Sequence, residues 1–292
     1  MRALVTGAAG FLGGHVARHL LEEGIEVTGF DLVTGELPIP WVKGDLTNVE
    51  DVRAAVRDQD VICHIGAIGD VYLAAQKPSL AALVNVVGTT RIAEAAAETG
   101  ARVVYASTWE VYGKPQHEPI DEDHPCSPDH PYSITKLAGE RMLLAADEFQ
   151  GVPVVALRLG TAYGSGMRAN SVFRLFIDKA RRGEPIEIQG DGSQSRQFTH
   201  ASDIARAFGL ACRSDLHGLA LNTLTTEQIS IKQLAELVVA RLPTGIKATA
   251  PRPGDAPSAV VSSERAREAL GWEALVPFEL GVESLIDSLS NA

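Results

Sequence analysis

The sequence predicts an α/β fold in which a doubly wound parallel sheet is followed by a smaller C-terminal lobe. In the first half of the 292-residue chain, short apolar runs alternate with segments of helical periodicity, which is typical of a parallel sheet with helices on both faces. Several of these runs are apolar throughout, as expected of strands buried on both sides. Beyond residue 160 the alternation loosens into glycine-rich segments.

The elements can be assigned in chain order. Strands are predicted at Arg2–Thr6, Glu26–Phe30, Trp41–Lys43, Val61–Ile65, Val103–Ser107 and Val154–Leu159. Helices are predicted between them at Phe11–Glu23, Val49–Arg57, Leu80–Glu98 and Ser133–Phe149. Later helical runs are expected at Ile231–Arg241, Glu264–Leu270 and Leu280–Ser290. They would form a smaller lobe across the C-terminal ends of the strands, the edge where open α/β sheets bind ligands.

Composition and charge narrow the class of partner. The chain has 26 Lys and Arg against 37 Asp and Glu, a net charge of −11, which argues against nucleic acid as a partner. The sequence has no apolar run of 18 residues and no signal-peptide pattern at its start, so no membrane partner is expected. Cys63, Cys126 and Cys212 follow neither disulfide nor zinc spacing, so we expect a cytoplasmic protein without a metal site.

A glycine triplet joins the first predicted strand to the first helix. Gly7, Gly10 and Gly13 form a Gly-x-x-Gly-x-x-Gly loop. Gly7 would allow the tight turn, Gly10 would admit a pyrophosphate against the backbone, and Gly13 would let helix and strand pack closely. The anion would lie on the unpaired N–H groups at the helix N-terminus. Because the triplet lies between a strand and an amphipathic helix, it predicts a Rossmann-type dinucleotide site.

Carboxylates after the second and third strands bear on the choice of dinucleotide. Asp31 lies eighteen residues after Gly13, where a carboxylate can accept both ribose hydroxyls and would repel a 2′-phosphate. No Arg or Lys occurs from Leu32 to Val42, so NAD is expected rather than NADP. Asp45 could hold the adenine amino group or belong to the start of the next helix, and the pattern leaves both open.

Tyr132 and Lys136 place a phenol and an ammonium on one face at a predicted helix start. Lowering a phenol pKa from about 10 to neutrality needs roughly 4 kcal/mol of phenolate stabilisation. One ammonium about 4 Å away supplies about that much at an effective dielectric near 20, and a positive nicotinamide ring would add more. Tyr132 is therefore a candidate general base. Thr108 comes directly after the predicted strand Val103–Ser107, at the level where Tyr132 should lie. Its hydroxyl could hydrogen-bond the substrate oxygen that Tyr132 deprotonates.

These residues resemble the extended short-chain dehydrogenase/reductase superfamily, specifically its NAD-dependent nucleotide-sugar epimerases and dehydratases. The likeness runs nearly end to end, and the stretch from Val61 to Gly113 is similar to UDP-glucose 4-epimerases without an obvious gap. It implies a 4-epimerase that acts on a UDP-hexose of the UDP-glucose and UDP-galactose type, through a transient 4-keto intermediate. Residues 1–160 would be the Rossmann NAD-binding domain, with a return segment near 197–222, and residues 161–292 mainly the nucleotide-sugar lobe.

The resemblance also assigns roles to individual residues. The catalytic residues would be Thr108, Tyr132 and Lys136. Contacts to NAD would come from Gly7, Gly10, Phe11, Leu12, Gly13, Asp31, Asp45, Leu46, Ile65, Gly66, Ala67, Asn85, Ser107, Tyr132 and Lys136. Contacts to the substrate would come from Thr108, Thr161, Arg196 and Arg252. The two arginines would clamp the diphosphate, a task that suits guanidinium groups.

Several departures from the family pattern bear on the reaction. Thr161 stands where an asparagine is usual, and Gly69 where the epimerase has a lysine that touches the cofactor. Trp109 replaces the acid that 4,6-dehydratases use, whereas Glu110 could still serve as a base in elimination. We expect Glu110 instead to be a helix-capping glutamate. The alternatives are a dehydratase, a decarboxylase, an NAD-dependent reductase and, from another class, a non-catalytic NAD-binding regulator.

Two further features concern the surface. The proline-broken stretch Lys114–Pro131 holds nine His, Cys, Asp and Glu side chains, but their spacing favours an acidic loop or lid over a metal site. The alanine-rich helices at Leu80–Glu98 and Ser133–Phe149 could pair with a second copy, as in family homodimers, or pack internally. The sequence does not separate these two interpretations.

Overall fold

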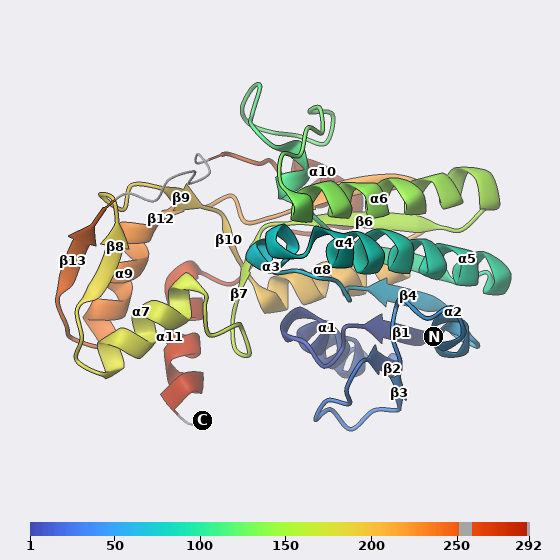
Figure 1. Ribbon diagram of the computed structural model, residues 1–292, viewed down its shortest axis with the longest axis horizontal. Coiled ribbons are helices and arrows are strands. Elements are labelled where there is room, and N and C mark those ends of the chain that lie inside the picture. Colours follow the sequence, from blue (N-terminus) through green and yellow to red (C-terminus); the bar gives the residue numbers. More distant parts are fainter. Residues whose placement is uncertain (251–258, 291–292) are drawn as a thin grey trace.

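The computed structural model describes residues 1–250 and 259–290, which form two lobes side by side (Figure 1). The larger lobe is built on seven strands in the order β11-β6-β5-β4-β1-β2-β3, and all six neighbouring pairs are parallel. This confirms the predicted α/β class and doubly wound sheet. The strands are β1 Arg2–Thr6, β2 Glu26–Asp31, β3 Trp41–Lys43, β4 Val61–His64, β5 Arg102–Thr108, β6 Val154–Leu159 and β11 Leu219–Thr223.

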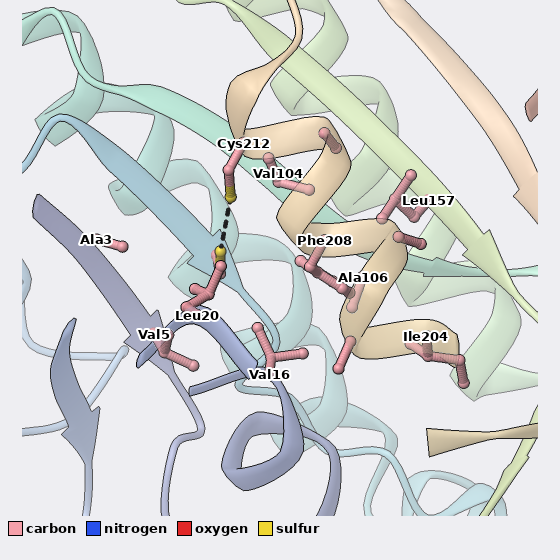
Figure 2. Packing of buried hydrophobic residues seen from close by; sticks show 14 of the residues in the cluster. Ala3, Val5, Val16, Leu20, Val104, Ala106, Leu157, Ile204, Phe208 and Cys212 are labelled. Carbon is pink, nitrogen blue, oxygen red and sulfur yellow. Dashed lines mark hydrogen bonds between the residues drawn. The ribbon is translucent and has the colours of Figure 1, made fainter. Parts of the chain in front are cut away.

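Helices cover both faces of this sheet. On one face lie α1 Phe11–Glu22 and α8 Ala201–Arg213, and on the other α2 Val49–Val56, α5 Thr89–Thr99 and α6 Pro131–Gln150. Figure 2 shows the hydrophobic core on the face of the sheet that α1 and α8 cover, where both helices direct aliphatic and aromatic side chains onto the strands. Within it the Sγ atoms of Cys63 and Cys212 lie 3.4 Å apart as free thiols.

Two elements of this lobe come from the second half of the chain. Helix α8 packs against α1, and β11 pairs with β6 to extend the sheet by one strand. Helix α10, Glu264–Leu270, contacts both of them. Just after it, the fully buried Trp272 donates its indole N–H to the backbone oxygen of Asp203 at 2.8 Å. The larger lobe is therefore completed by segments that follow residue 200.

The smaller lobe has a core of its own, formed by α7, α9, α11 and the strand β8. These elements span Val172–Arg181, Ile231–Arg241, Phe278–Ser290 and Ile186–Gln189, and β8 pairs in parallel with β13 Ile246–Thr249. Two short pairs lead from the sheet into this lobe. They are β7 Thr161–Tyr163 with β10 Phe198–His200, and β9 Ser195–Arg196 with β12 Ile229–Ser230.

The predicted helix over Leu80–Glu98 is part of a longer run. It comprises α4 Pro78–Ala82, a π-helical turn at Leu83–Gly88 and α5, and a short helix that was not predicted, α3 Val71–Gln76, precedes it. By length and composition alone, the 22 residues Pro78–Thr99 could cross a membrane. The most apolar stretch of 18 residues among them has a mean hydropathy of 1.2, and 44% of that stretch is buried inside the protein. The run packs against α6, as a core helix does.

The loop over Lys114–Pro131 is anchored to the chain that precedes α10. Ile120, which is fully buried, donates its backbone N–H to Val260 at 2.7 Å and accepts one from Ser262 at 2.8 Å. The loop rises above α10 in Figure 1. Across residues 1–250 and 259–290, no group of three or more His, Cys, Asp and Glu side chains could hold a metal ion.

Candidate active site

The glycine loop lies at the C-terminal edge of the sheet, between β1 and α1. Gly7 has a φ of +70°, and a Cβ there would lie 2.8 Å from the Cα of Gly66 in the loop after β4. At Gly13, a Cβ would lie only 2.0 Å from the Gly7 carbonyl oxygen. Only glycine fits this approach of α1 to β1 and of one loop to the other.

The first turn of α1 leaves backbone N–H groups for a ligand. Gly10 is the N-cap residue and supplies no capping side chain, and the first turn carries no acidic residue. The N–H groups of Phe11, Leu12 and Gly13 thus lie at the positive end of the helix dipole without a side-chain anion. This cradle fits a pyrophosphate group, so these residues are suited to hold the dinucleotide.

Asp31 and Asp45 both stand at the carboxyl ends of strands. Asp31 ends β2, and its carboxylate accepts N–H groups from Ala9 at 3.1 Å and Leu32 at 2.7 Å. Its oxygens retain lone pairs for ribose hydroxyls. Asp45 accepts the Thr47 N–H at 2.8 Å, while Asn48 is the N-cap of α2. Asp45 therefore shapes the turn before α2, without being its cap.

The loop after β4 is held by buried polar groups. The Thr6 hydroxyl accepts N–H groups from Ile65 at 3.0 Å and Gly66 at 2.9 Å. The Asn85 amide uses its oxygen and both of its N–H groups on Ile68 and on the Thr135 hydroxyl. Both N–H groups of the Asn85 amide are thus used within the protein, where they position this loop. Half-buried Ala67 and buried Leu46 flank the same loop.

His64 links the end of β1, next to the glycine loop, to the start of helix α5, a role that the sequence did not reveal. Its Nδ1 lies 2.8 Å from the Thr6 hydroxyl and its Nε2 lies 2.9 Å from the Thr89 hydroxyl. Because Thr6 already accepts two N–H groups, its own proton is donated to Nδ1, which assigns the Nε2–H tautomer. Burial, with a smaller effect of Lys136, lowers the pKa of His64 to about 3.

Tyr132 and Thr108 meet at the end of β5. Tyr132 follows Pro131 in the first turn of α6, and its backbone N–H donates to the N-cap residue His130. Thr108 is buried, accepts the Glu110 N–H at 3.3 Å and acts to lower the pKa of the Tyr132 phenol. A threonine hydroxyl has one proton and two lone pairs. Thr108 can therefore donate its proton to the phenolate or to a substrate oxygen.

The expected role of Glu110 is wrong. Thr108, not Glu110, caps the 3₁₀ turn Trp109–Tyr112. Burial raises the pKa of the Glu110 carboxyl against the opposing charge of Arg196, and burial together with Glu110 raises the pKa of Tyr132. Glu110 is therefore near enough to Tyr132 for its charge to act on the phenol.

Lys136 lies one turn after Tyr132 and is buried over another ring. Its Nζ is 4.1 Å from the centroid of the Tyr105 ring, a cation–π contact. Burial lowers the pKa of Lys136 to about 7, and the charge of Glu140 opposes this shift. Lys136 is not among the groups that shift the pKa of Tyr132, so the expected activation of the phenol by Lys136 together with NAD⁺ stays a prediction. The proposed base needs the positive charge of NAD⁺ as well.

A buried ion pair supports this corner of the site. Glu140 and Arg158 approach to 2.6 Å, and the side chains are 0% and 4% exposed. The Ser107 hydroxyl donates to Glu140 at 2.5 Å, so it is already committed to this carboxylate. Arg158 also donates to the Tyr112 hydroxyl, which donates to Asn222 in β11. The sequence pattern did not reveal Glu140, and only its spacing of four residues after Lys136 could have pointed to it.

A cavity of about 570 Å³ lies at the smaller lobe, lined mainly by side chains of α7, β8 and the segment around β9. Thr161 and Arg196 line it, together with Tyr72 of α3 and Lys179 of α7. The structure thus brings two of the expected substrate residues to one cavity. Arg252 lies outside the described residues.

Arg168, in the segment between β7 and α7, is bound to the larger lobe through Asp70. Its guanidinium donates to the carboxylate of Asp70 at 2.7 Å, and Asp70 in turn caps α3. The charge of Arg168 acts to lower the pKa of Tyr132. Asn170, which lines the cavity, reaches the same carboxylate oxygen at 3.4 Å. No motif in the sequence pointed to this cation.

Comparison with known proteins agrees with this geometry. Residues 3–222 match the model of the NAD dependent epimerase/dehydratase family. The chain is 32% identical to a UDP-glucose 4-epimerase of Mycolicibacterium smegmatis, covering 100% of this chain and 99% of the relative. It is 30% identical to UDP-glucuronic acid decarboxylase 1 of Danio rerio, over 99% and 73% of the two chains. The solved structure of MoeE5 with UDP-glucuronic acid and NAD superposes with a TM-score of 0.92, at 31% identity over 100% and 99%.

Proposed function

The chain belongs to the NAD-dependent epimerase/dehydratase family, and from this premise we propose that it is a nucleotide-sugar 4-epimerase acting on a UDP-hexose. Its cofactor is NAD. One observation carries the proposal: Tyr132 lies one helical turn before buried Lys136 on α6, and α6 packs against β5, the strand that Thr108 ends. The glycine cradle that would hold the dinucleotide lies at the same edge of the sheet.

In the proposed reaction Tyr132 removes the proton of the C4 hydroxyl while Thr108 holds the same oxygen. Bound NAD⁺ supplies the hydride acceptor and later the donor. The 4-keto sugar turns in the cavity, and Tyr132 returns its proton to the oxygen after the opposite face has received hydride. Lys136 keeps positive charge near the phenol and would bond the nicotinamide ribose.

The diphosphate stays anchored while the sugar turns. Arg196 lines the cavity next to Thr161, and a guanidinium suits the oxygens of a diphosphate. Arg252 is proposed as the second half of this clamp. Removing Arg196 should raise the substrate KM about tenfold or more with a smaller change in kcat, because the contact is equal in ground and transition states.

A second candidate substrate is UDP-glucuronic acid, and Arg168 favours it. The charge of the guanidinium acts on Tyr132, and the 57% exposed side chain binds Asp70 through Nη1. A cation near the C4 hydroxyl would suit a carboxylate on the neighbouring C5 substituent. A dehydratase or decarboxylase remains the alternative reaction, with Glu110 as the added base.

We also propose a cytoplasmic homodimer. Leu80, Leu83 and Val87 on the α4–α5 run are 37–43% exposed, and Ile134 and Met142 on α6 are 48% and 42% exposed. The two helical segments pack side by side. Their apolar side chains could meet those of a second copy, and sedimentation would measure the association.

The experiment incubates the purified protein with UDP-, dTDP- and GDP-hexoses and with UDP-glucuronic acid, without added cofactor. Epimerisation leaves the product mass unchanged, whereas dehydration and decarboxylation remove water and carbon dioxide. A reductase would instead consume added cofactor stoichiometrically, visible by absorbance. Tyr132→Phe should reduce kcat at least about a thousandfold. Near-full turnover in that variant would end the proposed mechanism.

A further inference from the structure

The region behind the catalytic pair contains a charged side chain that touches neither the cavity nor the dinucleotide cradle. Glu140 is 0% exposed and lies one helical turn after Lys136 and two turns after Tyr132. Residues four apart share a helix face. A carboxylate buried this deeply requires compensation, since its desolvation is costly.

All of the compensation comes from residues that shape the site. Glu140 Oε2 accepts from Ser107 Oγ at 2.5 Å and from Arg158 Nε at 3.2 Å, and Oε1 accepts from Arg158 Nη2 at 2.6 Å. Ser107 is the neighbour of Thr108 at the end of β5. Glu140 therefore ties α6, which carries Tyr132 and Lys136, to the strand end that carries Thr108.

Glu140 also supplies negative charge close to a buried amine. The groups that face Lys136 are the Tyr105 ring at 4.1 Å, His64 from β4, and Glu140. His64 is held neutral by burial, so it adds no charge beside the amine. Glu140 is thus the group on these packed elements that raises the pKa of Lys136 against burial.

We propose that Glu140 is a positioning residue for the reaction, holding Thr108 through Ser107 and keeping the Lys136 amine protonated. The inference rests on the proposed function for its catalytic consequence. It assigns two separable effects to one carboxylate: a hydrogen bond that fixes the strand end, and a charge that favours the ammonium.

Three variants separate the two effects. Glu140→Gln keeps the size and an acceptor oxygen but removes the charge. Ser107→Ala removes only the hydroxyl link. The double variant Glu140→Gln with Arg158→Met removes the guanidinium that the first change leaves unpaired, and so controls both for folding and for the charge of Arg158.

The holoenzyme is assayed for kcat against pH, and lysine labelled with ¹⁵N reports the Lys136 titration, assigned by its absence in Lys136→Met. In Glu140→Gln and in the double variant, the titration and the alkaline loss of kcat should both move to lower pH, by about one unit. Ser107→Ala should lower kcat about tenfold at every pH, with the titration unmoved.

The proposal is overturned if the double variant titrates like the wild type, or if Ser107→Ala produces the same shift. A wild-type protein that turns over no nucleotide sugar would defeat the proposed function instead. The ¹⁵N titration would still decide whether Glu140 holds the charge of Lys136, because it does not depend on turnover.

Discussion

Replacing Gly13 with alanine should test whether the glycine loop needs a residue without a Cβ at this position. The new Cβ would lie 2.0 Å from the Gly7 carbonyl oxygen and 2.6 Å from its carbonyl carbon. An ordinary contact begins at 3.4 Å, so backbone atoms must move by about 1.4 Å, the difference between the two distances. Overpacking of this kind costs roughly 1–3 kcal/mol. Because the displaced atoms form the cradle, NAD affinity should fall at least about tenfold, or 1.4 kcal/mol.

Gly14→Ala is the matched control. A Cβ there would meet only the Ala8 carbonyl oxygen, at 3.6 Å, and alanine gains up to about 1 kcal/mol over glycine inside a helix. Calorimetric titration with NAD and urea unfolding are measured on both variants. Gly13→Ala should lose affinity and stability, while Gly14→Ala keeps its affinity and gains stability. Equal behaviour of the two variants would refute the steric reasoning.

Three further predictions concern buried groups. Arg158→Met leaves the Glu140 carboxylate buried without its partner, so the free energy of unfolding in urea should fall by roughly 3–5 kcal/mol, and a loss under 1 kcal/mol would contradict the importance of the pair. His64 has a folded-state pKa of about 3 against 6.5 unfolded, so the unfolded state binds a proton first. The free energy of unfolding should therefore fall as the pH drops from 6.5 towards 3, by up to about 1.4 kcal/mol per pH unit. A His64→Asn variant should lose less unfolding free energy between pH 7.5 and 5.5, and an equal loss would argue against this effect. The hydrogen bond to Cys212 and burial raise the pKa of the Cys63 thiol, so Ellman's reagent should modify Cys63 and Cys212 only after unfolding, whereas rapid labelling of either in the native protein would show that this core opens.

The sequence alone predicted those parts of the site that depend only on residues close together in the chain. The expected strand Arg2–Thr6 and the turn at Gly7 depend on side-chain pattern and backbone conformation within a few residues, and both appear as expected. The spacing of Tyr132 and Lys136 likewise follows from helical geometry. The sequence could not anticipate that burial and the Glu110 carboxyl raise the pKa of Tyr132, because both effects arise only in the folded chain.

What the sequence determined by itself was therefore the α/β class, the dinucleotide loop and the phenol–amine pair, each encoded by neighbours along the chain. Only the tertiary structure decided that β11 completes the sheet, that His64 is neutral in one tautomer and that Glu140 lies behind Lys136. These features depend on contacts between residues far apart in the chain, such as His64 with Thr6 and Asn222 with Tyr112. A buried polar group acquires its charge state from whichever partners folding brings to it, and local pattern does not specify those partners.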